Sequence, residues 1–155
     1  MKKLIFQTCA ILTLGFAATY SNALAQETPG IEGAWISNVN VNDCQTGAFI
    51  RTVRSLVLFI HDGSFTEAGA TVTGQANPRT SSVGVWRHVE GKTYSATYQF
   101  VGLTQVGTFA TMARVTRMLQ LNGDLWTAQD RLQIYDINGN VLTTACSTAV
   151  GTRAL

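Results

Sequence analysis

The chain has 155 residues, 46% of them hydrophobic and only 13% charged, with 11 Lys+Arg and 9 Asp+Glu. Two of the basic residues lie in the predicted signal segment described next, so residues 26–155 carry 9 basic and 9 acidic side chains. A neutral domain lacks the basic surface that binds nucleic acid and the polybasic patch that binds anionic membranes. Its length fits one domain that forms its own hydrophobic core.

Residues 1–25 have the pattern of a cleavable secretory signal peptide. Two lysines follow the initial Met, residues 4–18 are mostly apolar, and residues 23–25 supply a small-x-small cleavage pattern. The apolar run is short and interrupted by polar residues, so we expect no stable membrane insertion. The sequence therefore predicts a periplasmic or secreted protein with a single domain over residues 26–155.

The rest of the chain shows no helical periodicity. Short runs rich in Val, Ile, Thr, Phe and Tyr recur between Gly, Asn and Asp residues, which is typical of strands and turns. We predict eight strands, at residues 31–41, 49–61, 64–70, 82–89, 92–102, 107–121, 124–136 and 140–150. The tight-turn signals are Asp62-Gly63, Glu90-Gly91, Asn122-Gly123 and Asn138-Gly139.

Eight antiparallel strands joined mostly by hairpins favour an all-β, up-and-down barrel, because closure removes the exposed strand edges. A two-sheet sandwich is the alternative. One connection, residues 69–82, is longer and rich in Gly, Thr and Ser, and it contains Pro78. It is either a lid or binding loop, or an ordinary surface excursion.

Cys44 and Cys146 are the two cysteines outside the signal segment. In an oxidising compartment such a pair is most simply one disulfide, which would close a loop of about 100 residues and stabilise the fold by about 4 kcal/mol. Cys44 follows the first strand and Cys146 lies in the last, so the bond would join the two strands that meet when a barrel closes. Neither cysteine has a nearby His or second Cys in sequence, and we expect no metal site and no cofactor.

Side chains alternate between the two faces of a strand, so the parity of a residue number predicts which side chains face the lumen. In the strand 31–41 the odd residues are the more apolar set, and Trp35 is one of them. In the strand 92–102 the inward set is Tyr94, Ala96, Tyr98 and Phe100.

The next two strands test this reading through their turn. A two-residue turn at Asn122-Gly123 pairs Leu121 with Asp124, so odd residues of 107–121 share a face with even residues of 124–136. Both sets are the more apolar choice, which makes the register self-consistent. The inward residues are then Phe109, Thr111, Ala113, Val115, Arg117, Leu119 and Leu121, with Trp126, Ala128, Asp130, Leu132 and Ile134.

Arg117 and Asp130 are the charged residues of that inward face. In the predicted register Val115 lies opposite Asp130 and Ala128 opposite Arg117, so the two charges are diagonal neighbours. Buried charges are costly unless paired. The pair is either a structural ion pair or a polar anchor that orients a ligand in an apolar cavity.

Two further pairs of polar residues have open interpretations. If Asp62-Gly63 is a two-residue turn, Arg54 and Glu67 both point inward; the opposite parity sends both outward. His61 and His88 lie at strand ends on one rim of the predicted barrel, where they could bind a metal or act as a base. No third ligand has suitable spacing, and turn histidines are usually solvated.

The pattern resembles the calycin group of lipocalin- and avidin-type barrels. The resemblance rests on Gly33-Ala34-Trp35 in the first strand, on the eight-strand meander, and on Arg153 just after the last strand. It implies that Arg153 packs over Trp35 at a closed end of the barrel. If Cys44 lies opposite Cys146, then Ser37 faces Arg153 and Trp35 is its diagonal neighbour. Barrels of the allene-oxide-cyclase and dirigent type are a second resemblance, and some of these steer cyclisation reactions.

These observations predict an exported barrel that holds a small, largely apolar molecule. The predicted ligand contacts are Tyr94, Tyr98, Phe100, Arg117, Trp126 and Asp130. One alternative is a cyclase or isomerase that uses Arg117 and Asp130 as an acid–base pair, although no nucleophile or phosphate-binding motif is present. Another is a structural or interaction barrel with a solid lumen. The sequence leaves the ligand's identity and the oligomeric state open.

Overall fold

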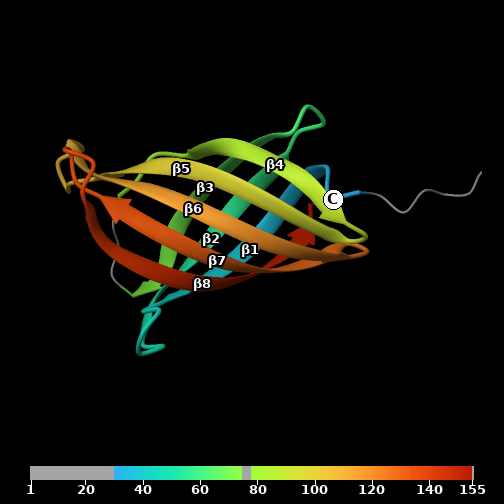
Figure 1. Cartoon of the computed structure of the whole chain (residues 1–155), viewed down its shortest axis with the longest axis horizontal. Helices are drawn as coiled ribbons and strands as arrows, with labels where there is room; N and C mark the ends of the chain where they lie inside the picture. Colours follow the sequence, from blue (N-terminus) through green and yellow to red (C-terminus); the bar gives the residue numbers. More distant parts are fainter. Residues whose placement is uncertain (1–29, 75–77, 155) are drawn as a thin grey trace, which may run out of the picture.

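The computed structural model describes residues 30–74 and 78–154. Within these ranges the chain forms a closed barrel of eight antiparallel strands in sequence order (Figure 1). The predicted signal peptide lies outside the described residues. The strands are β1 (Gly33–Asn42), β2 (Phe49–Phe59), β3 (Ser64–Gly74), β4 (Ser82–Glu90), β5 (Thr93–Leu103), β6 (Phe109–Asn122), β7 (Leu125–Tyr135) and β8 (Val141–Arg153).

The barrel prediction is confirmed and the sandwich alternative is wrong, because β8 pairs with β1. The two ends of the barrel differ. At one end, which we call the mouth, lie the connections 43–48, 78–81, 104–108 and 136–140; at the other, the packed end, lie the β2–β3, β4–β5 and β6–β7 turns. The described residues include no helix long and apolar enough to cross a membrane.

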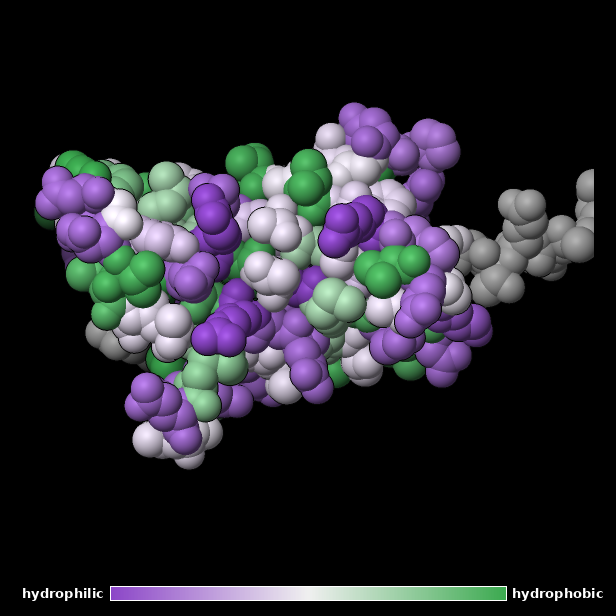
Figure 2. Space-filling model, in the orientation of Figure 1, coloured by the Kyte–Doolittle hydropathy of each residue, from purple (hydrophilic) through white to green (hydrophobic). Residues whose placement is uncertain are grey.

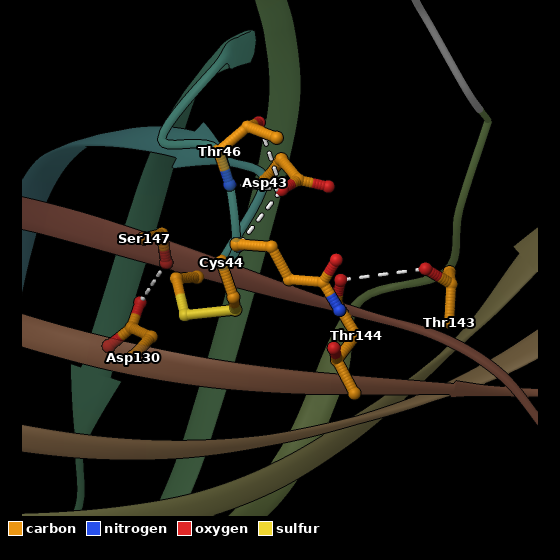
Figure 3. The surroundings of a disulfide bond; sticks show 9 residues. Asp43, Cys44, Thr46, Asp130, Thr143, Thr144 and Ser147 are labelled. Carbon is orange, nitrogen blue, oxygen red and sulfur yellow. Dashed lines mark hydrogen bonds between the residues drawn. A yellow bond between two sulfur atoms is a disulfide. The ribbon is translucent and has the colours of Figure 1, made fainter.

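The predicted disulfide is present. Cys44 and Cys146 are bonded, with 5.0 Å between their Cα atoms and a sequence separation of 102. Asn42 pairs with Cys146, so Cys44 lies just past the end of β1 and ties the mouth connection to β8. Figure 3 shows this bond, with Ser147 of β8 directed at Asp130 of the neighbouring strand.

The turn between β6 and β7 lies one residue later than predicted. Asn122 pairs with Leu125, so Gly123 and Asp124 form the two-residue connection. Gly123 has a φ of +60°, which suits the first central position of a type II′ turn. The shift moves the register by two positions and leaves each residue on its predicted face, but it places Arg117 directly opposite Asp130 instead of diagonal to it.

The turn between β2 and β3 has three residues, 61–63, because the backbone N–H of Ile60 donates to Ser64 O at 3.0 Å. A two-residue turn would pair even positions of β2 with odd positions of β3. The three-residue turn pairs odd positions with odd positions instead, so Val57 pairs with Glu67. Glu67 is buried and Arg54 is exposed. Neither sequence alternative, both inward or both outward, is correct.

β3 is longer than predicted, and its pairing with β4 is short. It pairs with β4 only from Ser64 to Glu67. Beyond that point the pairing with β3 ends, and residues 78–80 continue the pairing of β4 with β5, through Thr80 N–H to Val101 O at 2.9 Å and Leu103 N–H to Pro78 O at 2.8 Å. The predicted long loop is therefore only the segment between β3 and β4, and its residues 75–77 lie outside the described residues.

Large aromatic side chains fill the packed end. Trp35 and Trp126 are fully buried and meet edge to face with ring centroids 6.4 Å apart, and Phe59 contacts Phe65 at 5.3 Å. Gly151 pairs with Trp126, and a Cβ at this glycine would overlap the indole ring. The aromatic packing thus depends on a glycine in the neighbouring strand.

The outer surface does not present one continuous apolar face in the view of Figure 2, where hydrophobic side chains form separate groups among hydrophilic ones.

Phe109 was predicted to face the lumen, but it is 39% exposed. The β5–β6 pairing shifts between Gly102 and Leu103, and Phe109 lies beyond that shift, at the mouth.

Candidate functional site

A belt of buried polar side chains divides the lumen. Among the described residues, the buried polar and charged ones are Ser37, Ser55, Glu67, Ser82, Arg117, Asp130 and Ser147. Cross-strand pairing brings several together: Ser37 pairs with Ser55, Glu67 with Ser82, and Asp130 with both Arg117 and Ser147. We call this set the polar belt. Every strand except β5 contributes one member.

Arg117 and Asp130 form the strongest contact of the polar belt. Arg117 Nε donates to Asp130 Oδ1 at 2.7 Å and Nη2 donates to Oδ2 at 2.8 Å, while their side chains are 0% and 1% exposed. Ser147 Oγ donates to the same Oδ2 at 2.8 Å. This bidentate geometry, with a third donor, compensates for the burial of both charges.

The aromatic rings around Arg117 complete its surroundings. Its guanidinium carbon lies 5.2 Å from the Tyr98 ring centroid and 5.4 Å from that of Trp126, within cation–π range. Burial alone would lower the pKa of Arg117, but the charge of Asp130 and its hydrogen bonds to the guanidinium raise that pKa. Burial also raises the pKa of the Tyr98 phenol well above its ordinary value. Arg117 therefore stays charged and Tyr98 neutral at physiological pH.

Glu67 is the centre of a second charged group. Ser55 Oγ donates to Glu67 Oε1 at 2.6 Å, and Arg79 Nη2 lies 3.4 Å from the same oxygen. Arg79 also donates from Nη1 to Ser82 Oγ at 2.8 Å and lies 4.4 Å from the Phe100 ring centroid. Arg79 thus links the segment before β4 to β3 at the point where the two strands separate.

A cavity of about 440 Å³ lies above the polar belt, toward the mouth. Its apolar wall is formed by Val39, Val41, Val53, Phe100, Val115 and Leu132. Its charged lining residues are Arg51, Glu67, Arg79, Arg117 and Asp130. Pro78 and Gln105, from mouth connections, also line it, so the cavity is reached from that end.

The structure brings together four of the six predicted ligand contacts. Tyr98, Phe100, Arg117 and Asp130 line the cavity. Trp126 lies outside the lining, buried beneath Arg117. Tyr94 lies at the packed end, where its ring centroid is 6.0 Å from that of Trp86 and 5.1 Å from that of His88.

Sequence reasoning missed several lining residues. The orientation of Glu67 was left open because parity does not decide on its strand, and the three-residue turn places it inside the barrel. Arg79 follows Pro78 in a segment without periodicity, where no face is predictable. Ser147 and Arg51 lie on inward positions of β8 and β2, and extending the alternation rule to those two strands was the available signal.

Trp35 and Arg153 close the packed end. Arg153 lies directly opposite Trp35 in the β1–β8 pairing, where a diagonal relation was predicted, and its guanidinium carbon is 4.2 Å from the indole centroid. Its nitrogens donate to the carbonyls of Glu32 and Gly30 and to Asp124 Oδ1, each at 2.8 Å. Trp35 Nε1 donates to Ile31 O at 2.8 Å. This is the Arg-over-Trp contact that the calycin resemblance implies.

The two histidines lie at the packed end, away from the cavity. His61 Nδ1 lies 2.9 Å from Glu32 Oε2, and His88 Nε2 lies 2.8 Å from Gly91 O. Within the part of the chain that the structure describes, no three His, Cys, Asp or Glu side chains are grouped closely enough to hold a metal ion.

No protein-family model, no curated protein and no solved structure matches this chain.

Proposed function

We propose that this protein is an exported carrier that binds a small, largely apolar molecule in the lumen of its barrel. The cavity above the polar belt carries the proposal. Its volume of about 440 Å³ lies within the range of small-molecule sites, and apolar walls with a few polar groups at fixed positions are typical of such sites.

The division of the lumen supports binding over a purely structural role. Aromatic side chains pack the end near Trp35 and Trp126, but above the polar belt most of the apolar wall, apart from Phe100, consists of smaller side chains such as Val39 and Val115. A barrel that served only as a rigid body would gain stability from filling this space, because unfilled apolar volume is costly.

Two buried polar atoms of the cavity lining that lack a hydrogen-bond partner favour a ligand with a polar group. Arg117 Nη1 and Glu67 Oε2 are buried and make no hydrogen bond within the described residues. Each such group carries a desolvation cost. Both residues line the cavity, so a polar group of a ligand, or an ordered water molecule, at its base would satisfy them.

The acid–base alternative has less support. The pKa of Arg117 is raised, so its guanidinium is a poor proton donor. Both oxygens of Asp130 are already engaged, and together they accept three hydrogen bonds from Arg117 and Ser147. These contacts suit a fixed polar element of a binding site better than a group that exchanges protons with a substrate.

Export and a calycin-like barrel belong to the same proposal. The signal-like residues 1–25 and the Cys44–Cys146 disulfide both suit an oxidising compartment. The contact of Arg153 with Trp35 supports the likeness to lipocalin-type barrels.

The experiment is native mass spectrometry of the protein purified from its own host. We expect a population heavier than the processed chain by the mass of a small molecule that is released on unfolding. Uniformly ligand-free protein, which also fails to take up an apolar dye, would contradict the proposal.

A further inference from the structure

Apolar side chains are exposed around the mouth of the barrel. The two most exposed large hydrophobic residues of the described chain are Val106, 84% exposed, and Ile137, 78% exposed, at the tips of the β5–β6 and β7–β8 connections. Other exposed apolar residues begin the strands β2, β6 and β8 at the same end: Phe49, Phe109, Val141 and Leu142. We call these six residues the apolar rim. Turn tips usually carry Gly, Pro, Asn, Asp or Ser, so the two aliphatic tips stand out.

The turns that carry the two tips are fixed by backbone and polar groups. In the β5–β6 connection Thr104 N–H donates to Thr108 O at 2.8 Å. In the β7–β8 connection Asp136 N–H donates to Asn140 O at 3.0 Å, and the Asp136 carboxylate accepts the N–H of the same asparagine at 2.8 Å. None of these contacts involves an apolar side chain. The two tips are therefore held out into solvent by a preorganised backbone.

The apolar rim has no cationic surface beside it. The β1–β2, β5–β6 and β7–β8 connections contain no lysine or arginine, and their acids are Asp43 and Asp136. Both carboxylates accept hydrogen bonds within their own turns. In the remaining mouth connection, Arg79 is directed inward to Glu67. The mouth therefore lacks the basic cluster that recruits proteins to anionic lipids, and its contact surface is neutral or weakly acidic.

The arrangement of the apolar rim suits a fluid lipid layer better than a protein partner. Figures 1 and 2 share one orientation, and at their left end, where the β5–β6 and β7–β8 connections lie, hydrophobic side chains are separated by hydrophilic ones. A stable protein interface has a closely packed apolar core, which separate tips do not form. Lipid fills the space between such tips. The cavity opens among them, because Gln105, next to Val106, is one of its lining residues.

We propose that the apolar rim docks the mouth of the barrel on a zwitterionic lipid bilayer, so that the cavity opens onto the layer in which an apolar molecule dissolves. Only the side chains at the mouth enter the bilayer, to a depth of about 5–10 Å, and the contact is peripheral and reversible. The docking rests on the apolar rim alone. The exchange of a ligand with the bilayer rests also on the proposed carrier function.

The test is flotation of the full processed chain, with its disulfide intact, on vesicles of dioleoylphosphatidylcholine in a sucrose gradient. We expect the protein to float with the vesicles. The variant Val106→Asn/Ile137→Asn should lower the partition coefficient about tenfold or more, because full burial of even one aliphatic side chain is equivalent to about a tenfold change in an equilibrium constant.

The matched control is Val83→Asn/Val85→Asn, because these two valines are exposed on the outer wall of β4, away from the mouth. This variant should float like the unmodified protein. A near-UV circular dichroism spectrum verifies that both double variants are folded.

A second measurement locates the contact. Ile137→Trp adds an indole at a tip, and phosphatidylcholine brominated in its acyl chains quenches an indole that reaches them. Trp35 and Trp126 are fully buried and Trp86 packs on Phe59 at the packed end, so the native emission is insensitive to the bromine. We expect the added emission of Ile137→Trp to be quenched and that of an outer-wall tryptophan in β4 to persist.

Lipid charge and salt distinguish this contact from an electrostatic one. Adding phosphatidylglycerol to the vesicles, or raising NaCl from about 0.02 M to about 0.5 M, should leave flotation nearly unchanged. Flotation that requires the anionic lipid, that only the control variant abolishes, or that does not occur at all would overturn the docking inference. So would a lipid-free dimer that the rim variant dissociates, in the absence of flotation, since the rim would then bind a second copy.

Binding of the neutral apolar dye N-phenyl-1-naphthylamine in the absence of vesicles tests the carrier function separately. Dye binding without flotation overturns the docking inference and leaves the carrier proposal standing. Rim-dependent flotation of a protein that takes up no dye and no host ligand supports the docking and contradicts the carrier proposal.

Discussion

Arg117 lies directly opposite Asp130 across the β6–β7 pairing, and the two side chains form a bidentate ion pair that is sealed from solvent. The pair sits between the aromatic packing and the cavity. It therefore has two roles open to experiment: it stabilises the barrel wall and it forms the base of the proposed binding site.

Breaking the pair on one side should be strongly destabilising. We expect Asp130→Ala to lower the free energy of unfolding by about 3–5 kcal/mol, because it leaves the Arg117 charge buried and unpaired. The double variant Arg117→Met/Asp130→Leu should recover most of that loss. Urea denaturation of Arg117→Met, Asp130→Leu and their double variant measures this coupling, and additive losses would contradict the account.

Gly151 should tolerate no side chain while Trp126 is present. Gly151→Ala places a methyl group where the indole ring lies, so we expect a loss of about 1–3 kcal/mol from overpacking. Trp126→Phe removes part of the ring that the methyl group overlaps. In the double variant the two costs should therefore be less than additive, as measured by thermal unfolding, and strict additivity would show that the two positions are independent.

Reduction of the disulfide should destabilise the barrel without changing its topology. For a closed loop of this length the chain-entropy model gives about 4 kcal/mol. The measurement is denaturation of the native protein and of the Cys44→Ser/Cys146→Ser variant. The intact mass should also rise by the mass of two hydrogen atoms on reduction. An unchanged mass would mean that the bond is absent from the isolated protein.

His61 should titrate above its ordinary range. The hydrogen bond to Glu32, and the charge of Glu32, raise the pKa of His61. Because the folded-state pKa is the higher one, any stabilisation from the pair is fully present below the ordinary pKa of about 6.5 and is lost as the pH rises through the raised value. Proton NMR of the imidazole measures this pKa. Glu32→Gln should lower it, and an unchanged value would contradict the contact.

The alternation of side chains explains why so much of the barrel was predictable. Eight runs with turn signals between them determine a meander, and period-two alternation assigned Trp35, Tyr98, Arg117 and Trp126 to the inside, where they lie. The same rule gave the correct faces although the turn at Gly123 was predicted one residue too early, because a register shift of two positions keeps every residue on its face.

The parts of the site that were not predicted depend on turn lengths and strand partners, which the alternation of side chains does not reveal. A three-residue turn at 61–63 placed Glu67 inside and Arg54 outside, a result that no two-residue turn gives. Arg79 enters the site from a segment that separates from β3 while it continues the pairing of β4 with β5, and that separation depends on tertiary packing. The cavity begins above the level of the barrel that the aromatic side chains of the packed end fill.

The most direct test of the central claim is to fill the cavity. Leu132→Trp places a large ring in the lumen above the polar belt, whereas Thr116→Trp places the same ring on the exposed outer face of β6. Binding of N-phenyl-1-naphthylamine is measured by fluorescence for both variants and for the unmodified protein. We predict that Leu132→Trp weakens dye binding about tenfold or more and that Thr116→Trp leaves it unchanged. Equal binding to all three proteins would contradict a binding site in the lumen.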